Sequence, residues 1–189
     1  MLNQEEFALG RLYFVREEFF DRFCSNSSLS IPIKSGYTRS GEHPGRPHIC
    51  INVPDPERPL QTLLWLIPIS SRIEKYEKEA ARQRLKYGTC DKIQIVDLHG
   101  NKRAALIQNM IPCTPNYICG TYLDKHTGIP IEVNDEDFRR IMTSARKLIL
   151  LHKNAPQCGF LFNDVKGISK ALFQDLKTGA NIHEMAMGR

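Results

Sequence analysis

Four side chains stand at the ends of two apolar segments and could bind a phosphate group. Arg46 and His48 lie at the start of the first segment, and Ser70 and Ser71 follow the second. A guanidinium group stabilises negative charge, and an imidazole exchanges a proton near neutral pH. Hydroxyl groups at the start of a helix, together with its first backbone amides, form a natural anion site. These residues therefore predict a phosphate-binding site.

The two apolar segments are expected to bring these side chains together. Residues 47–53 and 62–69 are rich in branched and aromatic residues, and a Pro-Asp-Pro-Glu-Arg-Pro turn separates them. This pattern predicts an antiparallel hairpin, in which the first strand begins beside the end of the second. Each residue alone also has a plainer interpretation: His48 packs inside a strand, Arg46 is a surface charge, and the serines cap a helix.

A charged helix is predicted from Ser71 to about Lys86, with Ser70 or Ser71 as its N-cap and Gly88 as its end. Glu74 follows Ser71 by three residues, as in a capping box. Basic residues outnumber acidic ones in this segment, six to three. This excess suits either contact with phosphates or a solvated surface held by ion pairs between successive turns. The basic residues are Arg72, Lys75, Lys78, Arg82, Arg84 and Lys86.

The remaining elements predict an α+β domain that spans residues 1–179. An opening strand (7–15) and a short helix (16–24) precede a long polar loop, and a second hairpin (92–98 and 103–111) precedes two weaker strands (117–123 and 129–133). Asn134 caps a helix with a clear apolar face. A last helix covers about 164–177, Gly179 stops it, and residues 180–189 are expected to fray.

Composition limits the classes of function. The formal net charge of +5 suits an anionic partner. No apolar run approaches the roughly 20 residues of a membrane span, and no basic-then-apolar leader is visible, so we expect a cytoplasmic protein without a membrane partner. The six cysteines include no C-x-x-C pair, which favours free thiols over zinc. The acidic residues fall on helix starts and exposed faces, so neither a metal nor a cofactor is expected.

The order of these parts resembles the ToxN/TenpN toxins of type III toxin–antitoxin systems, the TenpN branch above all. Three stretches carry the resemblance: Gly-Arg-Pro-His-Ile-Cys-Ile-Asn-Val, Leu-Leu-Trp-Leu-Ile-Pro-Ile-Ser-Ser with its basic helix, and Leu-Ile-Gln-Asn-Met-Ile-Pro at 106–112. The resemblance implies a strongly twisted antiparallel sheet with an inserted helix and C-terminal helices. It also implies a metal-independent endoribonuclease that a repetitive, pseudoknotted RNA antitoxin holds inactive in a cyclic toxin–RNA assembly, with a role in phage defence.

The resemblance also assigns roles to residues. The essential pair of the family falls on Arg46 and Ser71, with Ser70 beside them. Arg46 stands where relatives such as ToxN have lysine, and Arg72-Ile73 replaces their Pro-Lys. The implied reaction is attack of the RNA 2′-hydroxyl on the adjacent phosphate, which leaves a 2′,3′-cyclic phosphate, with His48 as base or acid.

RNA contacts are expected from the basic helix and from the long loop. Lys75 and its neighbours would neutralise phosphates of a cellular or phage RNA, and tyrosines would stack on unpaired bases. The predicted contact residues are Tyr37, Arg39, Arg72, Lys75, Tyr76, Lys78 and Arg82.

Three alternatives stay open from the sequence. The first is a basic module that binds RNA or a protein without cutting, and the second is a small regulatory domain in which the charge is incidental. The third is a ribonuclease toxin with a protein antitoxin.

Overall fold

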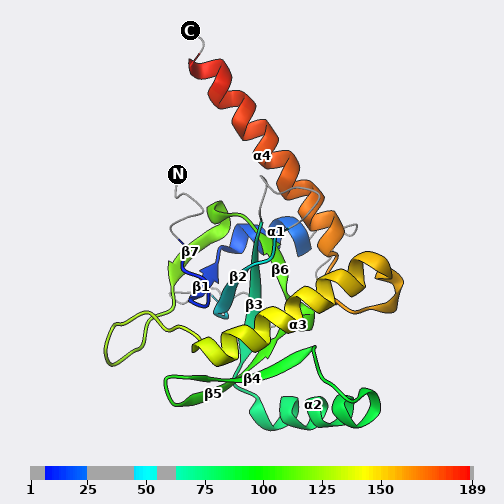
Figure 1. The fold of residues 1–189 in the computed structure, drawn as a ribbon. Coiled ribbons are helices and arrows are strands. Elements are labelled where there is room, and N and C mark those ends of the chain that lie inside the picture. The colour runs from blue at the N-terminus through cyan, green and yellow to red at the C-terminus, as the bar shows by residue number, and fades with distance from the viewer. Residues whose placement is uncertain (1–6, 25–44, 55–62, 188–189) are drawn as a thin grey trace.

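The computed structural model describes residues 7–24, 45–54 and 63–187 as one α+β domain built on a twisted antiparallel sheet (Figure 1). The strand order is β4-β5-β3-β2-β1-β7, and β6 also pairs with β3. The strands are β1 (Leu12–Val15), β2 (His48–Asn52), β3 (Leu64–Ser70), β4 (Ile93–Leu98), β5 (Asn101–Leu106), β6 (Ile111–Cys113) and β7 (Ile118–Thr121). The predicted fold class is confirmed.

The β2–β3 hairpin forms the centre of the sheet. Its register pairs His48 with Pro68 and Asn52 with Leu64. Every residue of β3 is buried, because helices cover both faces of the sheet, so the strand reads as a continuous apolar run rather than an alternating one. The predicted hairpin is confirmed.

The second edge of β3 is shared by two strands. β5 pairs with Ile69 and Ser70, whereas β6 pairs with residues 64–66. A 3-10 turn (Ile107–Asn109) separates β5 from β6, so the predicted continuous strand 103–111 is wrong. The interruption accommodates Pro68. The amide of Ile69 donates to Pro47 O, just before β2, and because successive residues of a strand alternate, the nitrogen of Pro68 faces the other edge of β3.

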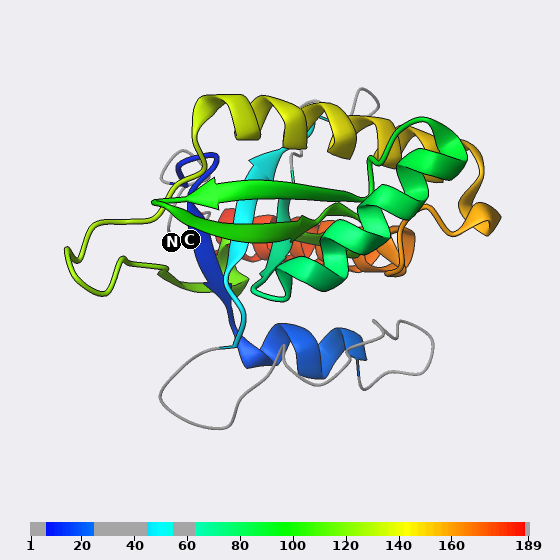
Figure 2. The same cartoon turned by 90° about the horizontal axis from the view of Figure 1, so that it is seen from below.

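Three helices cover the two faces of the sheet. Helix α3 (Asp135–Asn154) lies on one face, and α1 (Glu17–Cys24) lies on the opposite side (Figure 2). Helix α4 (Val165–Met187) packs with α1, through Ile168 and Leu172 among the phenylalanines of α1. Ile141, Ala145 and Leu148 of α3 pack on the other face of the strands.

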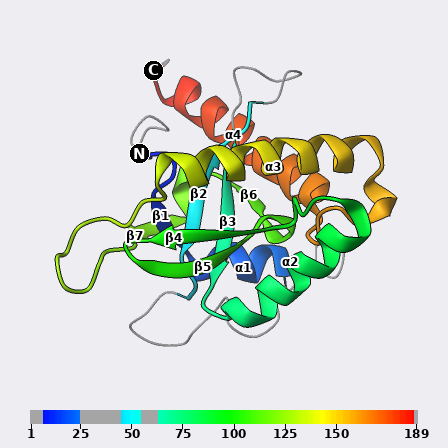
Figure 3. The same ribbon diagram turned by 60° about the horizontal axis from the view of Figure 1, so that its bottom comes forward.

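Helix α2 (Ile73–Tyr87) lies beside the β4–β5 hairpin, away from the main core (Figure 3). Ala80 is its one buried side chain, and it packs against Ile93 and Ala104 of the hairpin. The helix ends at Gly88, whose φ of 76° is left-handed and whose amide donates to Arg84 O. Most of the other side chains of α2 are exposed, while Ile73 and Tyr76 pack partly against the hairpin.

Several predicted boundaries are wrong. Helix α4 continues through Gly179 to Met187, because one glycine costs a helix only about 1 kcal/mol and helix-forming residues follow it. Residues 129–133 form two isolated bridges rather than a strand, and the opening strand starts at Leu12 after a turn at Gly10. The predicted loop at 25–44 lies outside the described residues.

Candidate functional site

The backbone register brings Arg46 to Ser70. Ile69 N donates to Pro47 O at 3.3 Å, which extends the β2–β3 pairing to that pair of residues. One further step along the same register places Arg46 opposite Ser70. Directly opposed residues of an antiparallel pair point to the same face of a sheet. Two residues far apart in the sequence therefore meet where β3 ends and α2 is about to begin.

The exposure of the expected site residues differs. Ser71 is exposed and Arg46 is half-buried, whereas Ser70 is 6% exposed. On the side away from Arg46, Ser70 pairs with Ala104 of β5. Ser71 and Arg46 can thus reach a ligand from solvent, while Ser70 forms the floor of the site.

The position of His48 argues against its expected role in proton transfer. Its side chain is 1% exposed, and its pKa is lowered to about 3. Burial is the main cause, the charge of Arg46 adds to it, and a hydrogen bond with the backbone of Arg46 opposes it. Burial therefore keeps the imidazole neutral inside the fold, away from a ligand in solvent.

The start of α2 lacks a side-chain cap. The N-cap residue is Arg72, whose side chain makes no capping hydrogen bond, so the predicted Ser71–Glu74 capping box is wrong. The Ser70 hydroxyl oxygen instead accepts from Arg72 N at 3.3 Å, and Ser71 O accepts from Ile73 N at 2.9 Å. The first bond uses the hydroxyl oxygen of Ser70 and the second uses the backbone carbonyl oxygen of Ser71, so neither involves the exposed hydroxyl of Ser71.

Positive charge gathers at this helix start. Arg72 occupies the N-cap position and Lys75 lies in the first turn, both exposed, with Glu74 as the acidic residue of that turn. A helix N-terminus already carries about half a positive charge, so cations there are unfavourable by a few tenths of a kcal/mol or more. An anion bound at Ser71 would offset this repulsion, which makes the position suitable for a phosphate.

The other predicted RNA contacts extend along α2. Lys75 Nζ lies 5.4 Å from the ring centroid of Tyr76, and that ring packs partly against the α2–hairpin core. Lys78 is exposed, and Arg82 pairs with Glu79 at 2.8 Å. Tyr37 and Arg39 lie outside the described residues. With 3.6 residues per turn, Lys75, Lys78 and Arg82 lie on one side of α2, whereas the Tyr76 ring turns toward the hairpin.

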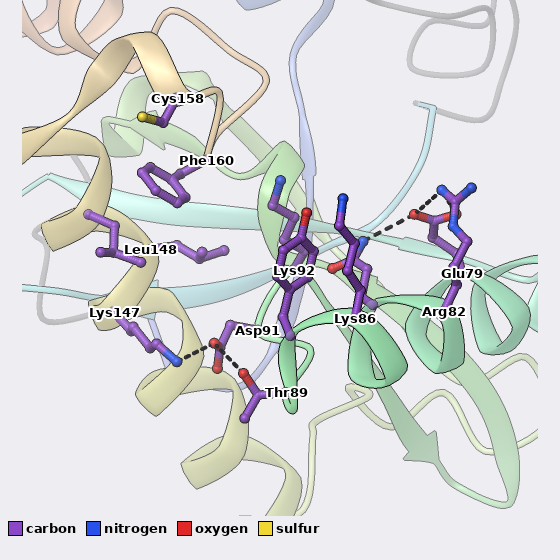
Figure 4. A pocket seen from close by; sticks show the side chains of 13 residues that line it. Glu79, Arg82, Lys86, Thr89, Asp91, Lys92, Lys147, Leu148, Cys158 and Phe160 are labelled. Atoms are coloured by element: carbon purple, nitrogen blue, oxygen red, sulfur yellow. Dashed lines mark hydrogen bonds and ion pairs between the residues drawn. The ribbon is translucent and has the colours of Figure 1, made fainter.

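A cavity at the other end of α2 is a feature that sequence reasoning missed (Figure 4). It has a volume of about 820 Å³ and lies between α2, α3 and the segment that follows α3. Lys86, Lys92 and Phe160 line it. Lys86 belongs to the recognised basic helix, but nothing in the sequence relates it to Phe160.

The described residues include both buried and exposed free cysteines. They contain no group of three His, Cys, Asp or Glu side chains that could hold a metal ion. Cys50 and Cys113 are buried free thiols, and burial raises the pKa of both, that of Cys50 to about 12. Across the same residues, every helix is too short or too polar to cross a membrane.

The fold is similar to that of a solved structure, AbiQ, a lactococcal anti-phage endoribonuclease belonging to the type III toxin–antitoxin system. The two chains match with a TM-score of 0.58 and 13% sequence identity over 90% of this chain and 99% of that one. The match confirms the fold implied by the resemblance to ToxN-type toxins. No protein-family model matches the sequence, and comparison with curated proteins gives no significant match.

Proposed function

We propose that this protein is a metal-independent endoribonuclease toxin of a type III toxin–antitoxin system. Its target is cellular or phage RNA in the cytoplasm. A repeat-derived, pseudoknotted RNA antitoxin inhibits it in a cyclic toxin–RNA assembly, and the toxin cuts this RNA into its repeat units. The support is the likeness of the fold to AbiQ, which is itself an anti-phage endoribonuclease of such a system.

One observation carries the proposal to particular residues: the β2–β3 pairing reaches Pro47 and Ile69, so its continuation places Arg46 opposite Ser70 at the uncapped start of α2. The Ser71 hydroxyl and the first amides of α2 hold the scissile phosphate, and the Ser70 hydroxyl supports it from below. Arg46 stabilises the negative charge that develops on the phosphorane, and Lys75 contacts a flanking phosphate.

The reaction is a transesterification within the RNA. The 2′-oxygen forms a bond to phosphorus while the bond from phosphorus to the 5′-oxygen breaks. The products are a 2′,3′-cyclic phosphate and a 5′-hydroxyl, and the proton lost by the 2′-hydroxyl is balanced by the one gained at the 5′-oxygen. Because His48 is buried and neutral, it is not the group that carries this proton.

Expression with the native upstream sequence tests the proposal. The purified complex is expected to contain a short RNA of discrete length that ends in a 2′,3′-cyclic phosphate. Ser71→Ala and Arg46→Ala are each expected to abolish that end. Absence of bound RNA, combined with absence of toxicity when the protein is expressed alone, would overturn the proposal.

A non-catalytic RNA-binding module is the second candidate. The burial of His48 favours it, because the residue expected to move protons is withdrawn from the surface. This candidate predicts that the purified protein shifts RNA in a gel but leaves it intact, with Ser71→Ala binding equally well.

A further inference from the structure

The cavity at the C-terminal end of α2 has the size and position of a second ligand site. Its volume of about 820 Å³ lies within the range of roughly 300–1,000 Å³ that small-molecule sites occupy. Residues of α2, the segment between α2 and β4, α3 and the segment after α3 form its walls, and Lys86, Lys92 and Lys147 are among the side chains that line it (Figure 4). Ser71 stands at the opposite end of α2, so the cavity is separate from the site described above.

Positive charge dominates this cavity. Two of its cations are neutralised: Arg82 by Glu79 at 2.8 Å, and Lys147 by Asp91 at 2.5 Å. Lys86 and Lys92 also line the cavity, and within the described part of the chain neither makes a salt bridge. The cavity thus carries two cations in excess of its carboxylates, which suits an anionic ligand.

Aromatic rings accompany both lysines. Lys86 Nζ lies 5.0 Å from the ring centroid of Tyr87, a cavity residue that is 67% exposed. Lys92 Nζ lies 5.7 Å from the ring centroid of Phe162, and Phe160 forms part of the cavity wall. Aromatic faces interleaved with cations are the pattern by which proteins bind unpaired nucleotides, the ring stacking on a base and the cation contacting its phosphate.

A row of basic side chains connects this cavity to Ser71. With 3.6 residues per turn, Lys75, Arg82 and Lys86 lie within about 40° of one another around the axis of α2, and Lys78 lies next to this row. The 15 residues of α2 span about 22 Å at 1.5 Å per residue. At roughly 3.4 Å per stacked nucleotide, this length equals about six nucleotides of single-stranded RNA.

We propose that the cavity binds an unpaired nucleotide of the same RNA strand whose phosphate is held at Ser71, about six nucleotides away. Tyr87 stacks on the base, Lys86 and Lys92 contact the adjoining phosphates, and the basic row of α2 follows the strand between the two sites. The idea rests on the proposed function for the identity of the ligand as RNA.

Binding of labelled single-stranded RNA oligonucleotides of 4 to 12 nucleotides tests the idea. The full chain carries Ser71→Ala, so that the RNA is not cut. Affinity is expected to rise steeply between about four and eight nucleotides, when the strand becomes long enough to span both sites. Adding Lys86→Gln and Lys92→Gln is expected to weaken binding of the 8-mer about tenfold and to lower the slope of log affinity against log salt by about 1.4, at roughly 0.7 per lost phosphate contact.

Two further variants complete the design. Tyr87→Ala removes an exposed ring and is expected to weaken the 8-mer about tenfold while it changes the salt slope little. Lys125→Gln is the matched control: it removes one exposed charge from the loop after β7, at the edge of the sheet farthest from α2. It is expected to leave the binding of every length unchanged.

The outcomes separate this inference from the proposed function. Length-dependent binding that only the cavity variants reduce supports the second site, whether or not the wild-type protein cuts RNA. Equal loss in the Lys125→Gln control, or unchanged 8-mer binding in the cavity variants, overturns it, even where the wild-type protein cuts RNA. In the second case the cavity would be left to a protein or small-molecule ligand.

Discussion

Helices α2 and α3 begin in opposite ways. At the start of α3, Asn134 accepts from the amide of Asp137 at 2.9 Å, and three acidic residues complement the positive end of the helix. Asp137 in turn accepts from Asp97 N at 2.9 Å and forms an ion pair with Arg140. At the start of α2, no side chain caps the helix and Arg72 adds a cation.

The difference separates a structural helix start from one suited to a ligand. The start of α3 satisfies its own amides and charge, and it fixes the helix to β4. The start of α2 has no side-chain cap, and its one acidic residue, Glu74, is accompanied by the cations of Arg72 and Lys75. A fold that caps one helix completely and leaves the other without a side-chain cap has stability to gain at α2, and the phosphate site that we propose there accounts for this difference.

Placing a carboxylate at the start of α2 makes it resemble the start of α3. Ser71→Asp is expected to raise the free energy of unfolding by about 0.5 kcal/mol through the helix dipole. It is also expected to slow RNA cleavage at least about 1,000-fold, because the carboxylate occupies and repels the phosphate. Urea denaturation and a gel-based cleavage assay give the two quantities.

The matched control for this variant is Asn116→Asp, which adds the same charge at an exposed position before β7. The control is expected to change neither quantity measurably. Cleavage by Ser71→Asp within tenfold of the wild-type rate would contradict the phosphate site at α2.

The two helix starts also differ in the buried titratable group beside each. Asp137 is held charged: burial alone would raise its pKa, but hydrogen bonds from Asp97 N, Arg140 and Asn134 lower it overall. His48 is held neutral, with its pKa lowered to about 3 from 6.5. Below pH 6.5, His48 becomes protonated in the unfolded state, whereas in the folded state it stays neutral down to about pH 3.

The unfolding free energy is therefore expected to fall by about 1.4 kcal/mol per pH unit below pH 6.5, or roughly 3 kcal/mol by pH 4, through His48 alone. His48→Gln is expected to remove most of this slope in urea denaturation. An NMR titration of the wild-type imidazole checks the assignment directly, and a midpoint near 6.5 would show that His48 is accessible to solvent.

Alanine substitution of the polar side chain at each helix start, Asn134 or Ser71, gives a smaller expected change in the free energy of unfolding than the titration of His48 does. Asn134→Ala is expected to cost about 1 kcal/mol of stability, because it removes the cap of α3. Ser71→Ala is expected to stay within about 0.5 kcal/mol of the wild type, because the Ser71 side chain is exposed and does not cap α2. Equal losses in urea denaturation would mean that Ser71 is a structural cap after all.

Sequence periodicity predicted the elements that are long or strongly patterned. The β2–β3 hairpin, the Asn134 cap and the end of α2 at Gly88 all follow from local physical chemistry, namely apolar runs, a short polar side chain before a helix, and a left-handed glycine. The meeting of Arg46 with Ser70 also follows, because the register of a hairpin is nearly set once both strands are known.

Features that depend on distant parts of the chain were not predictable. The burial of His48 depends on the helices that cover its strand, and the break at 107–109 depends on β3 offering its edge to two strands. Ser71 does not occupy the N-cap position because β3 continues to Ser70 and α2 begins only at Ile73. Residues of α2 and Phe160 line the same cavity, and no local sequence pattern predicts that they lie close together.

Cleavage of a labelled RNA by the purified protein in EDTA tests the central claim most directly. The account predicts products with a 2′,3′-cyclic phosphate and a 5′-hydroxyl, and rates at least about 100-fold lower for Ser71→Ala and for Arg46→Ala, while both variants still bind RNA. Cleavage that EDTA abolishes, or that continues at the wild-type rate in both variants, would contradict it.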